Sequence, residues 1–175
     1  GLFDVSHMGQ VILRPKSGRY ADAALALERL VPVDVLGLVE GRQRYGMFTN
    51  DAGGIEDALM FANRGDHLFV VVNAACKEQD VAHMQARLSD VCEVVPVTDR
   101  ALVALQGPAA EAALSALVPG AAAMKFMDVA ILPWAGVDLW ISRSGYTGED
   151  GYEISVPNAK AVAFAQALLA RPGVA

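Results

Sequence analysis

The sequence has few basic residues, and they are not clustered. Among 175 residues there are 14 Lys or Arg and 20 Asp or Glu, which gives a formal net charge of −6. Proteins that bind nucleic acid usually carry a basic stripe that displaces counterions from the phosphates. We therefore expect no nucleic-acid surface, whereas a small polar or anionic ligand or a protein partner stays open.

Long hydrophobic runs are also missing. No apolar stretch reaches the roughly 18–20 residues that a membrane-spanning helix needs, so we expect no membrane partner. The hydrophobic share of 54% is too high for a disordered chain. A chain of this length can build one good-sized core or two small ones.

Cysteine and histidine are scarce. Cys76 and Cys92 lie far apart among apolar neighbours, so we expect two buried thiols in a reducing compartment rather than a disulfide. The three histidines share no metal-ligand spacing with one another or with the cysteines, so the sequence predicts no metal site. Dinucleotide-binding and P-loop glycine motifs and internal repeats are absent as well.

The predicted elements mix strands and helices without regular β–α repeats. Helical spacing of apolar residues predicts helices at 20–30, 74–89, 108–117 and 159–170. Short strand-like runs joined by hairpins lie between them. This order favours an α+β fold, with mixed, largely antiparallel sheets and packed helices, over a doubly wound sheet. A composition change near 98–100 suggests two subdomains, 13–98 and 1–12 with 99–175.

The most informative segment is residues 142–153, SRSGYTGEDGYE, between two strand-like runs. Its three glycines allow positive φ or the close approach of a ligand. Glu153 re-enters a strand with its neighbours Tyr152 and Ile154 on the opposite face, so its carboxylate shares one side with Ser155. Taken alone, the segment is better interpreted as an acidic, glycine-rich hairpin turn.

Two other segments have a structural and a functional interpretation. Asp4 and His7 could form an acid–imidazole pair, although hydrogen bonds to the local backbone are the better interpretation. Asn73 ends a strand just before a helix, where it would cap that helix, a contact of about 1 kcal/mol, or touch a ligand.

Five segments together resemble the glycine cleavage system T-protein family. They are LFDVSHMG at 2–9, YGMFTNDAGGIED at 45–57, VVVNAACKEQD at 70–80, ALQGPAA at 104–110 and SGYTGEDGYEISVP at 144–157. The resemblance implies an aminomethyltransferase of glycine catabolism and one-carbon metabolism. In that reaction the lipoyl arm of the H protein presents an aminomethyl group, tetrahydrofolate takes the methylene, and ammonia leaves.

The resemblance also implies the setting of the protein. The partners would be the lipoylated H protein and tetrahydrofolate, in the bacterial cytoplasm or the mitochondrial matrix. Residues 1–175 would be an internal fragment of the folate-binding region, without the family's N-terminal segment and C-terminal domain.

Site residues follow from the family position by position. Glu153 would accept hydrogen bonds from the pterin's N–H groups, and two tyrosines would offer flat apolar faces with polar tips. Arg143 is expected to be structural, because the arginine that meets folate in the family falls beyond residue 175. The residues expected at the folate site are Tyr45, Tyr146 and Glu153, with Met8, Val72, Asn73 and Phe126 shaping the pocket.

One position departs from the family pattern. The family carries two adjacent aspartates after Gly-Gly-x-x, the second being catalytic, whereas this chain has Asp57-Ala58. Neighbouring strand residues point to opposite faces, so Asp57 cannot replace the missing carboxylate without a backbone shift. We therefore expect impaired transfer, with Asp57 as the remaining candidate catalytic acid. The alternatives are a dimethylglycine- or sarcosine-dehydrogenase-like folate protein, an iron–sulfur assembly factor, and a non-catalytic folate-binding module.

Overall fold

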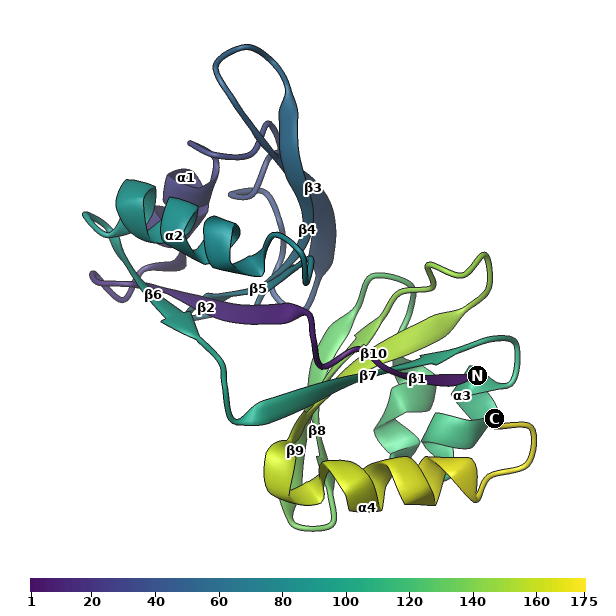
Figure 1. The fold of residues 1–175 in the computed structure, drawn as a ribbon. Coiled ribbons are helices and arrows are strands. Elements are labelled where there is room, and N and C mark those ends of the chain that lie inside the picture. Colours follow the sequence, from purple (N-terminus) through teal and green to yellow (C-terminus); the bar gives the residue numbers. More distant parts are fainter. The chain divides into compact units, whose positions relative to one another are not determined.

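The chain forms two compact units. A computed structural model describes all residues, Gly1–Ala175. Met8–Thr98 make up what we call the inserted unit, and Gly1–His7 with Asp99–Ala175 make up the split unit (Figure 1). Each unit holds one five-stranded antiparallel sheet with helices packed on it, which confirms the predicted α+β class.

The inserted unit is a sheet covered on one face by two helices. Val11, Leu59 and Phe61 are fully or almost fully buried from the sheet, and Leu27 and Met84 join them from the helices. The sheet has the order β3-β4-β5-β2-β6. Its elements are β2 (Gly9–Pro15), α1 (Tyr20–Leu27), β3 (Gln43–Thr49), β4 (Ile55–Asn63), β5 (Leu68–Val72), α2 (Lys77–Leu88) and β6 (Cys92–Pro96).

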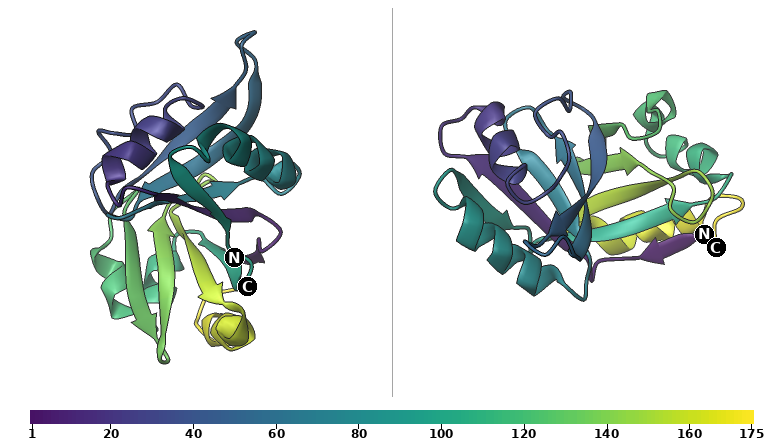
Figure 2. Two further views of the ribbon diagram at one scale, coloured as in Figure 1. Left: turned by 90° about the vertical axis from the view of Figure 1, so that its left-hand side faces the viewer. Right: turned by 90° about the horizontal axis from the view of Figure 1, so that it is seen from above.

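The split unit has its own core around the central strand β10. Tyr152 and Ile154 of β10 are buried in this core together with Phe164 and Leu168 of α4. Helix α4 packs against β7 and β10 of this sheet (Figure 2). The sheet order is β1-β7-β10-β9-β8. Its elements are β1 (Leu2–Asp4), β7 (Arg100–Gln106), α3 (Ala110–Ser115), a 3₁₀ helix (Pro119–Ala123), β8 (Val129–Trp134), β9 (Val137–Arg143), β10 (Gly151–Pro157) and α4 (Asn158–Leu169).

Element types agree with the sequence predictions, while several ends differ. The helix predicted over 20–30 ends at Leu27, and the helix predicted from residue 74 begins at Lys77. The first boundary between the units lies at Met8 rather than near residue 13, because β2 pairs with β5 and β6 inside the inserted unit. Ala175 and Leu2 both lie in the split unit, where their backbones share a hydrogen bond of 2.7 Å.

Candidate functional site

Glu153 sits on the middle strand of the split unit's sheet. It pairs with Ala104 of β7 on one side and Ser142 of β9 on the other. Because Tyr152 and Ile154 fill the core, the Glu153 carboxylate lies on the opposite face of the sheet. The residue is only 9% exposed, so an acidic group is held largely away from water.

The partner of this carboxylate is Tyr146, from the loop before β10. Burial raises the pKa of Glu153 to about 7, and a hydrogen bond with the Tyr146 hydroxyl opposes the rise. Burial and the charge of Glu153 also raise the pKa of Tyr146. The Tyr146 residue is 56% exposed, so the pair combines a buried carboxyl group with an accessible aromatic ring.

Gln106 organises the loop that carries Tyr146. Its side-chain oxygen accepts hydrogen bonds from the Tyr146 backbone N–H (3.2 Å) and the Thr147 hydroxyl (3.4 Å), while its amide nitrogen donates to the Ser144 carbonyl (3.3 Å). Gly151 has to be glycine because a Cβ there would lie 2.4 Å from the Gln106 carboxamide. No local sequence pattern indicates this role of Gln106, because it depends on the pairing between β7 and β10.

Arg143 braces the same loop, and its predicted structural role is confirmed. The guanidinium donates to Asp150 (2.5 Å), to Glu111 (2.6 Å) and to the Met124 carbonyl (2.6 Å). It also lies 5.3 Å from the ring centroid of Tyr152. The hydrogen bond that Arg143 donates to Asp150 is the main reason why the pKa of Arg143 is raised further. Each of its three nitrogen atoms donates to a protein group.

Phe126 is the other expected site residue of the split unit. It lies in the loop before β8 and is 62% exposed. A large aromatic side chain so exposed offers apolar area to a ligand or partner.

In the inserted unit, the structure brings together three expected residues: Asp57, Ala58 and Asn73. The Asn73 side-chain amide donates to Asp57 Oδ1 (2.8 Å) and to the Ala58 carbonyl (3.1 Å). Asn73 was also expected to cap α2, and that expectation is wrong. The N-cap position is Cys76, since the helix begins at Lys77, and the Asn73 side chain is turned to β4 instead.

Asp80 is a buried acid in the first turn of α2. It is 1% exposed, and its Oδ2 has no hydrogen-bond partner. Burial, followed by a hydrogen bond with Asp57, raises the pKa of Asp80 to about 7. Burial also tends to raise the pKa of Asp57, but hydrogen bonds from Asn73 and Asp80 hold it below its usual range. The spacing of Asp80, Met84 and Leu88 along one helix face was the signal for this burial.

The two sides of the inserted unit's sheet separate Asp57 from Ala58. Asp57 pairs with Phe48, whose side chain is buried under the helices, so Asp57 belongs to the helix-covered face. Ala58 pairs with Met47, and the neighbouring pair on that other face is Tyr45 with Met60. The position where the family places its catalytic aspartate therefore shares a face with Tyr45, which is 52% exposed.

Val72 and Met8 are the last two residues expected at the folate site, and they differ in how deeply they are buried. The Val72 side chain is fully buried in the inserted unit's core, so only its backbone is available to a pocket. Met8 is half-buried just before β2. Sequence reasoning missed the burial of Val72 because the register of β5 decides which residues of the apolar run 70–72 face the helices.

The Asp4 side chain forms a hydrogen bond with the local backbone, as expected. Its carboxylate accepts from the Ser6 N–H (3.0 Å), and the Ser6 hydroxyl donates to the Leu102 carbonyl (3.2 Å). The Ser6 N–H and hydroxyl bonds are the main reason why the pKa of Asp4 is lowered, and His7 contributes least.

The cysteines form no disulfide, and no group of side chains is arranged as a metal site. Both cysteines are free; Cys92 is buried as expected, but Cys76 is half-exposed because it stands at the start of α2. No three His, Cys, Asp or Glu side chains gather in a way that could hold a metal ion. None of the helices has both the length and the apolar character needed to cross a membrane.

Comparison with known proteins gives consistent matches. Residues 1–173 match the family model of the GCVT N-terminal domain. The mitochondrial aminomethyltransferase of Dictyostelium discoideum is 40% identical over 180 residues, covering 97% of this chain and 43% of that protein. The mitochondrial aminomethyltransferase of Flaveria trinervia is 41% identical over 177 residues, covering 96% of this chain and 42% of that protein. The chain thus spans less than half the length of the curated relatives it matches.

Solved structures agree with the sequence matches. The glycine cleavage system aminomethyltransferase T from Bartonella henselae superposes with a TM-score of 0.86 at 36% identity, covering 97% of this chain and 45% of that one. A heterotetrameric sarcosine oxidase from Corynebacterium matches with a TM-score of 0.64 at 19% identity. The match covers 96% of this chain and 80% of the sarcosine oxidase chain, and at this identity it shows only that the two share a fold. From the family match and the Bartonella likeness together, the chain belongs to the glycine cleavage T-protein family, as a copy of its GCVT N-terminal domain.

Proposed function

We propose that this chain is the folate-binding part of an aminomethyltransferase of the glycine cleavage system. The observation that carries the proposal is the pair formed by buried Glu153 and exposed Tyr146, in a chain whose relatives carry the aminomethyltransferase name. The activity is a proposal because the chain spans less than half the length of those relatives.

The residues present fit a folate. A pterin offers an edge of N–H donors, and a carboxylate held near Tyr146 is a matching acceptor. The pterin also has flat faces, which the exposed ring of Tyr146 suits. The raised pKa of Glu153 favours such a ligand, because N–H donors would stabilise the ionised carboxylate that burial disfavours.

Within the transfer reaction, tetrahydrofolate would supply the nitrogen that accepts the one-carbon unit. The chain's own contribution is to bind and orient, with Glu153 fixing the donor edge and aromatic rings excluding water. A carboxylate near the reacting atoms would stabilise developing positive charge, but the side chain at position 58 is a methyl group. Asp57 remains the candidate acid, although its place on the other face of β4 and its hydrogen bond from Asn73 argue against that role.

The remaining partner is the H protein with its lipoyl arm, which would deliver the aminomethyl group. The compartment depends on the organism: the mitochondrial matrix in a eukaryote, where the relatives' names carry the word mitochondrial, or the bacterial cytoplasm.

The proposal is tested by turnover. Aminomethyl-loaded H protein and tetrahydrofolate are mixed with the chain and with Glu153→Ala, and methylenetetrahydrofolate and ammonia are measured. We expect slow turnover that Glu153→Ala abolishes. Folate binding without any turnover, even in Ala58→Asp, would support the non-catalytic folate-binding module instead.

A further inference from the structure

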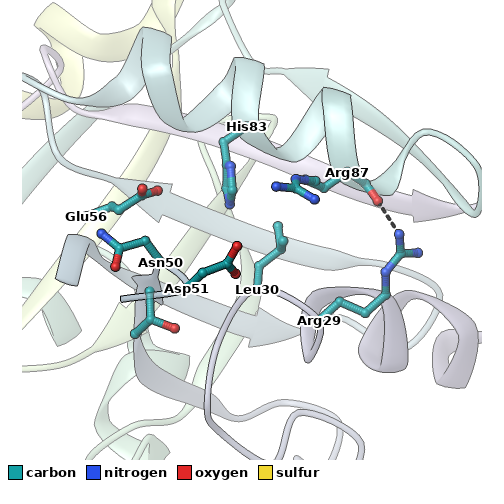
Figure 3. A pocket seen from close by; sticks show the side chains of 8 residues that line it. Arg29, Leu30, Asn50, Asp51, Glu56, His83 and Arg87 are labelled. Atoms are coloured by element: carbon teal, nitrogen blue, oxygen red, sulfur yellow. Dashed lines mark hydrogen bonds between the residues drawn. The ribbon is translucent and has the colours of Figure 1, made fainter. Parts of the chain in front are cut away.

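A second group of polar side chains surrounds a cavity of about 210 Å³ in the inserted unit. The walls come from the end of α1, the β3–β4 hairpin and α2 (Figure 3). None of the residues expected at the folate site takes part. The lining residues are Arg29, Leu30, Thr49, Asn50, Asp51, Glu56, His83 and Arg87.

One wall of the cavity carries donors. His83 and Arg87 lie one turn apart on α2 and both project toward the cavity (Figure 3). The His83 Nε2 atom is buried and has no hydrogen-bond partner. Its ring is held edge-on against Phe48, with the centroids 5.4 Å apart. Leaving a buried nitrogen without a hydrogen bond is unfavourable, and a ligand that bonds to it would remove that cost.

The two arginines of the cavity differ in what they can offer. Arg29 is already neutralised, because it binds Asp90 (3.0 Å) and the Arg87 carbonyl (2.7 Å). The Arg87 guanidinium is exposed and makes no ion pair. Arg87 therefore provides the available positive charge, and Arg29 fixes the helix end beside it.

The opposite wall carries acceptors. The Asn50 side-chain oxygen Oδ1 accepts from the Ala52 and Gly54 backbone N–H groups, which fixes the hairpin turn. Asp51 and Glu56 face the helix across the cavity and make no ion pair (Figure 3). Two carboxylates thus stand opposite one guanidinium and one imidazole.

From this arrangement we infer that the cavity binds a small zwitterion of the aliphatic amino acid class. Its carboxylate would meet Arg87 and His83, and its ammonium group would meet Asp51 and Glu56. A simple anion would face two carboxylates, and a simple cation would face Arg87. A divalent metal finds no set of three suitable ligands here.

The size of the cavity limits the ligand further. Its volume of about 210 Å³ lies below the roughly 300–1,000 Å³ typical of sites for drug-sized molecules. Leu30 offers a single apolar contact, which suits a short methylene chain. This inference does not depend on the proposed folate chemistry, because the two sites share no residue.

The experiment is a titration of the full chain by ¹H–¹⁵N NMR. The probes are glycine, β-alanine and γ-aminobutyrate, whose charges are set progressively further apart, and the single-charge controls are acetate and methylammonium. Each is added up to about 50 mM, which exceeds the millimolar dissociation constants typical of weak sites. The variants are Arg87→Gln and Asp51→Asn, and Arg14→Gln, an exposed arginine on β2, is the matched control.

We expect at least one zwitterion to shift the lining residues' amides saturably, while neither single-charge probe does so. Arg87→Gln and Asp51→Asn should each weaken binding by about tenfold or more, and Arg14→Gln should leave it unchanged. The inference is overturned if no zwitterion binds to a folded chain. It is equally overturned if acetate or methylammonium alone binds as well, or if binding survives in both cavity variants.

Discussion

At the scale of single residues, Glu153 is the group on which the account depends. The family resemblance identified it from the GYTGEDGYE segment, and strand alternation correctly placed it opposite the core. What alternation could not give is its burial to 9% exposure or the hydrogen bond with Tyr146, because both depend on how the loop before β10 folds back.

The raised pKa of Glu153 predicts a pH-dependent stability. The unfolded carboxyl loses its proton near pH 4.5, but the folded one keeps it to about pH 7. The free energy of unfolding should therefore fall as pH rises through this window, by up to about 3 kcal/mol. In Glu153→Gln this contribution disappears. Urea unfolding from about pH 4 to about pH 8 measures it, and parallel curves for both proteins would refute it.

Asp80 gives a second prediction in the same pH range. Its folded pKa of about 7 exceeds the unfolded value of 3.8, so it too lowers stability as pH rises between them. Asp80→Asn should be more stable than the parent chain above pH 7 and should lose the advantage below pH 4. If the substitution destabilises the protein at all pH values, the proton assigned to Asp80 is not there.

Position 58 carries the prediction about catalysis. Ala58→Asp places a carboxylate on the face of β4 that carries Tyr45, where the family has its catalytic aspartate. Proton transfer by a positioned side chain contributes about 10²–10⁴-fold, so turnover should rise by about 10²-fold or more. Ala86→Asp, on the exposed side of α2, is the matched control. Turnover that stays the same or falls in Ala58→Asp would show that this position is not the defect.

At the scale of elements, two side chains fix the conformation of the loop between β9 and β10, in addition to the glycines within it. Arg143 and Gln106 hold it through hydrogen bonds to Asp150, Glu111 and the loop backbone. The sequence predicted a glycine-rich turn here, because glycine spacing is a local signal. It could not predict Gln106 as the organiser, because residues 106 and 151 are neighbours only through β7–β10 pairing.

Replacing Arg143 should therefore lower both the stability of the fold and the affinity of the site for folate. Arg143→Ala leaves two carboxylates without their cation, so we expect a loss of about 2–4 kcal/mol in the free energy of unfolding. Folate affinity should fall too, since Tyr146 stands on the same loop. Chemical denaturation and ligand titration measure the two effects, with Arg14→Ala as control. An unchanged stability would mean that Arg143 contributes nothing as a brace.

At the scale of the whole molecule, the chain has two hydrophobic cores with no residue in common. One core lies wholly within Met8–Thr98, and the other within the split unit. Hairpins and helix spacing predicted the α+β class, because both are local patterns. The boundary at Met8 could not be read locally, since β2 belongs to its unit through pairing with β5, far along the chain.

Separate cores predict that residues 8–98 fold as an isolated domain. The fragment contains the complete β3-β4-β5-β2-β6 sheet and both of its helices. Circular dichroism and NMR should show a helical and strand content like that in the full chain, with cooperative unfolding. A fragment with no dispersed amide signals would contradict this division.

The most direct test of the central claim is a titration of the full chain with 5-formyltetrahydrofolate, followed by Trp and Tyr fluorescence. Glu153→Ala is the test variant, and Glu149→Ala, an exposed acid in the same loop, is the matched control. The account predicts saturable binding by the parent chain and the control, lost in Glu153→Ala. Binding that survives in Glu153→Ala, or no saturable binding by a folded chain, would contradict a folate site built around Glu153.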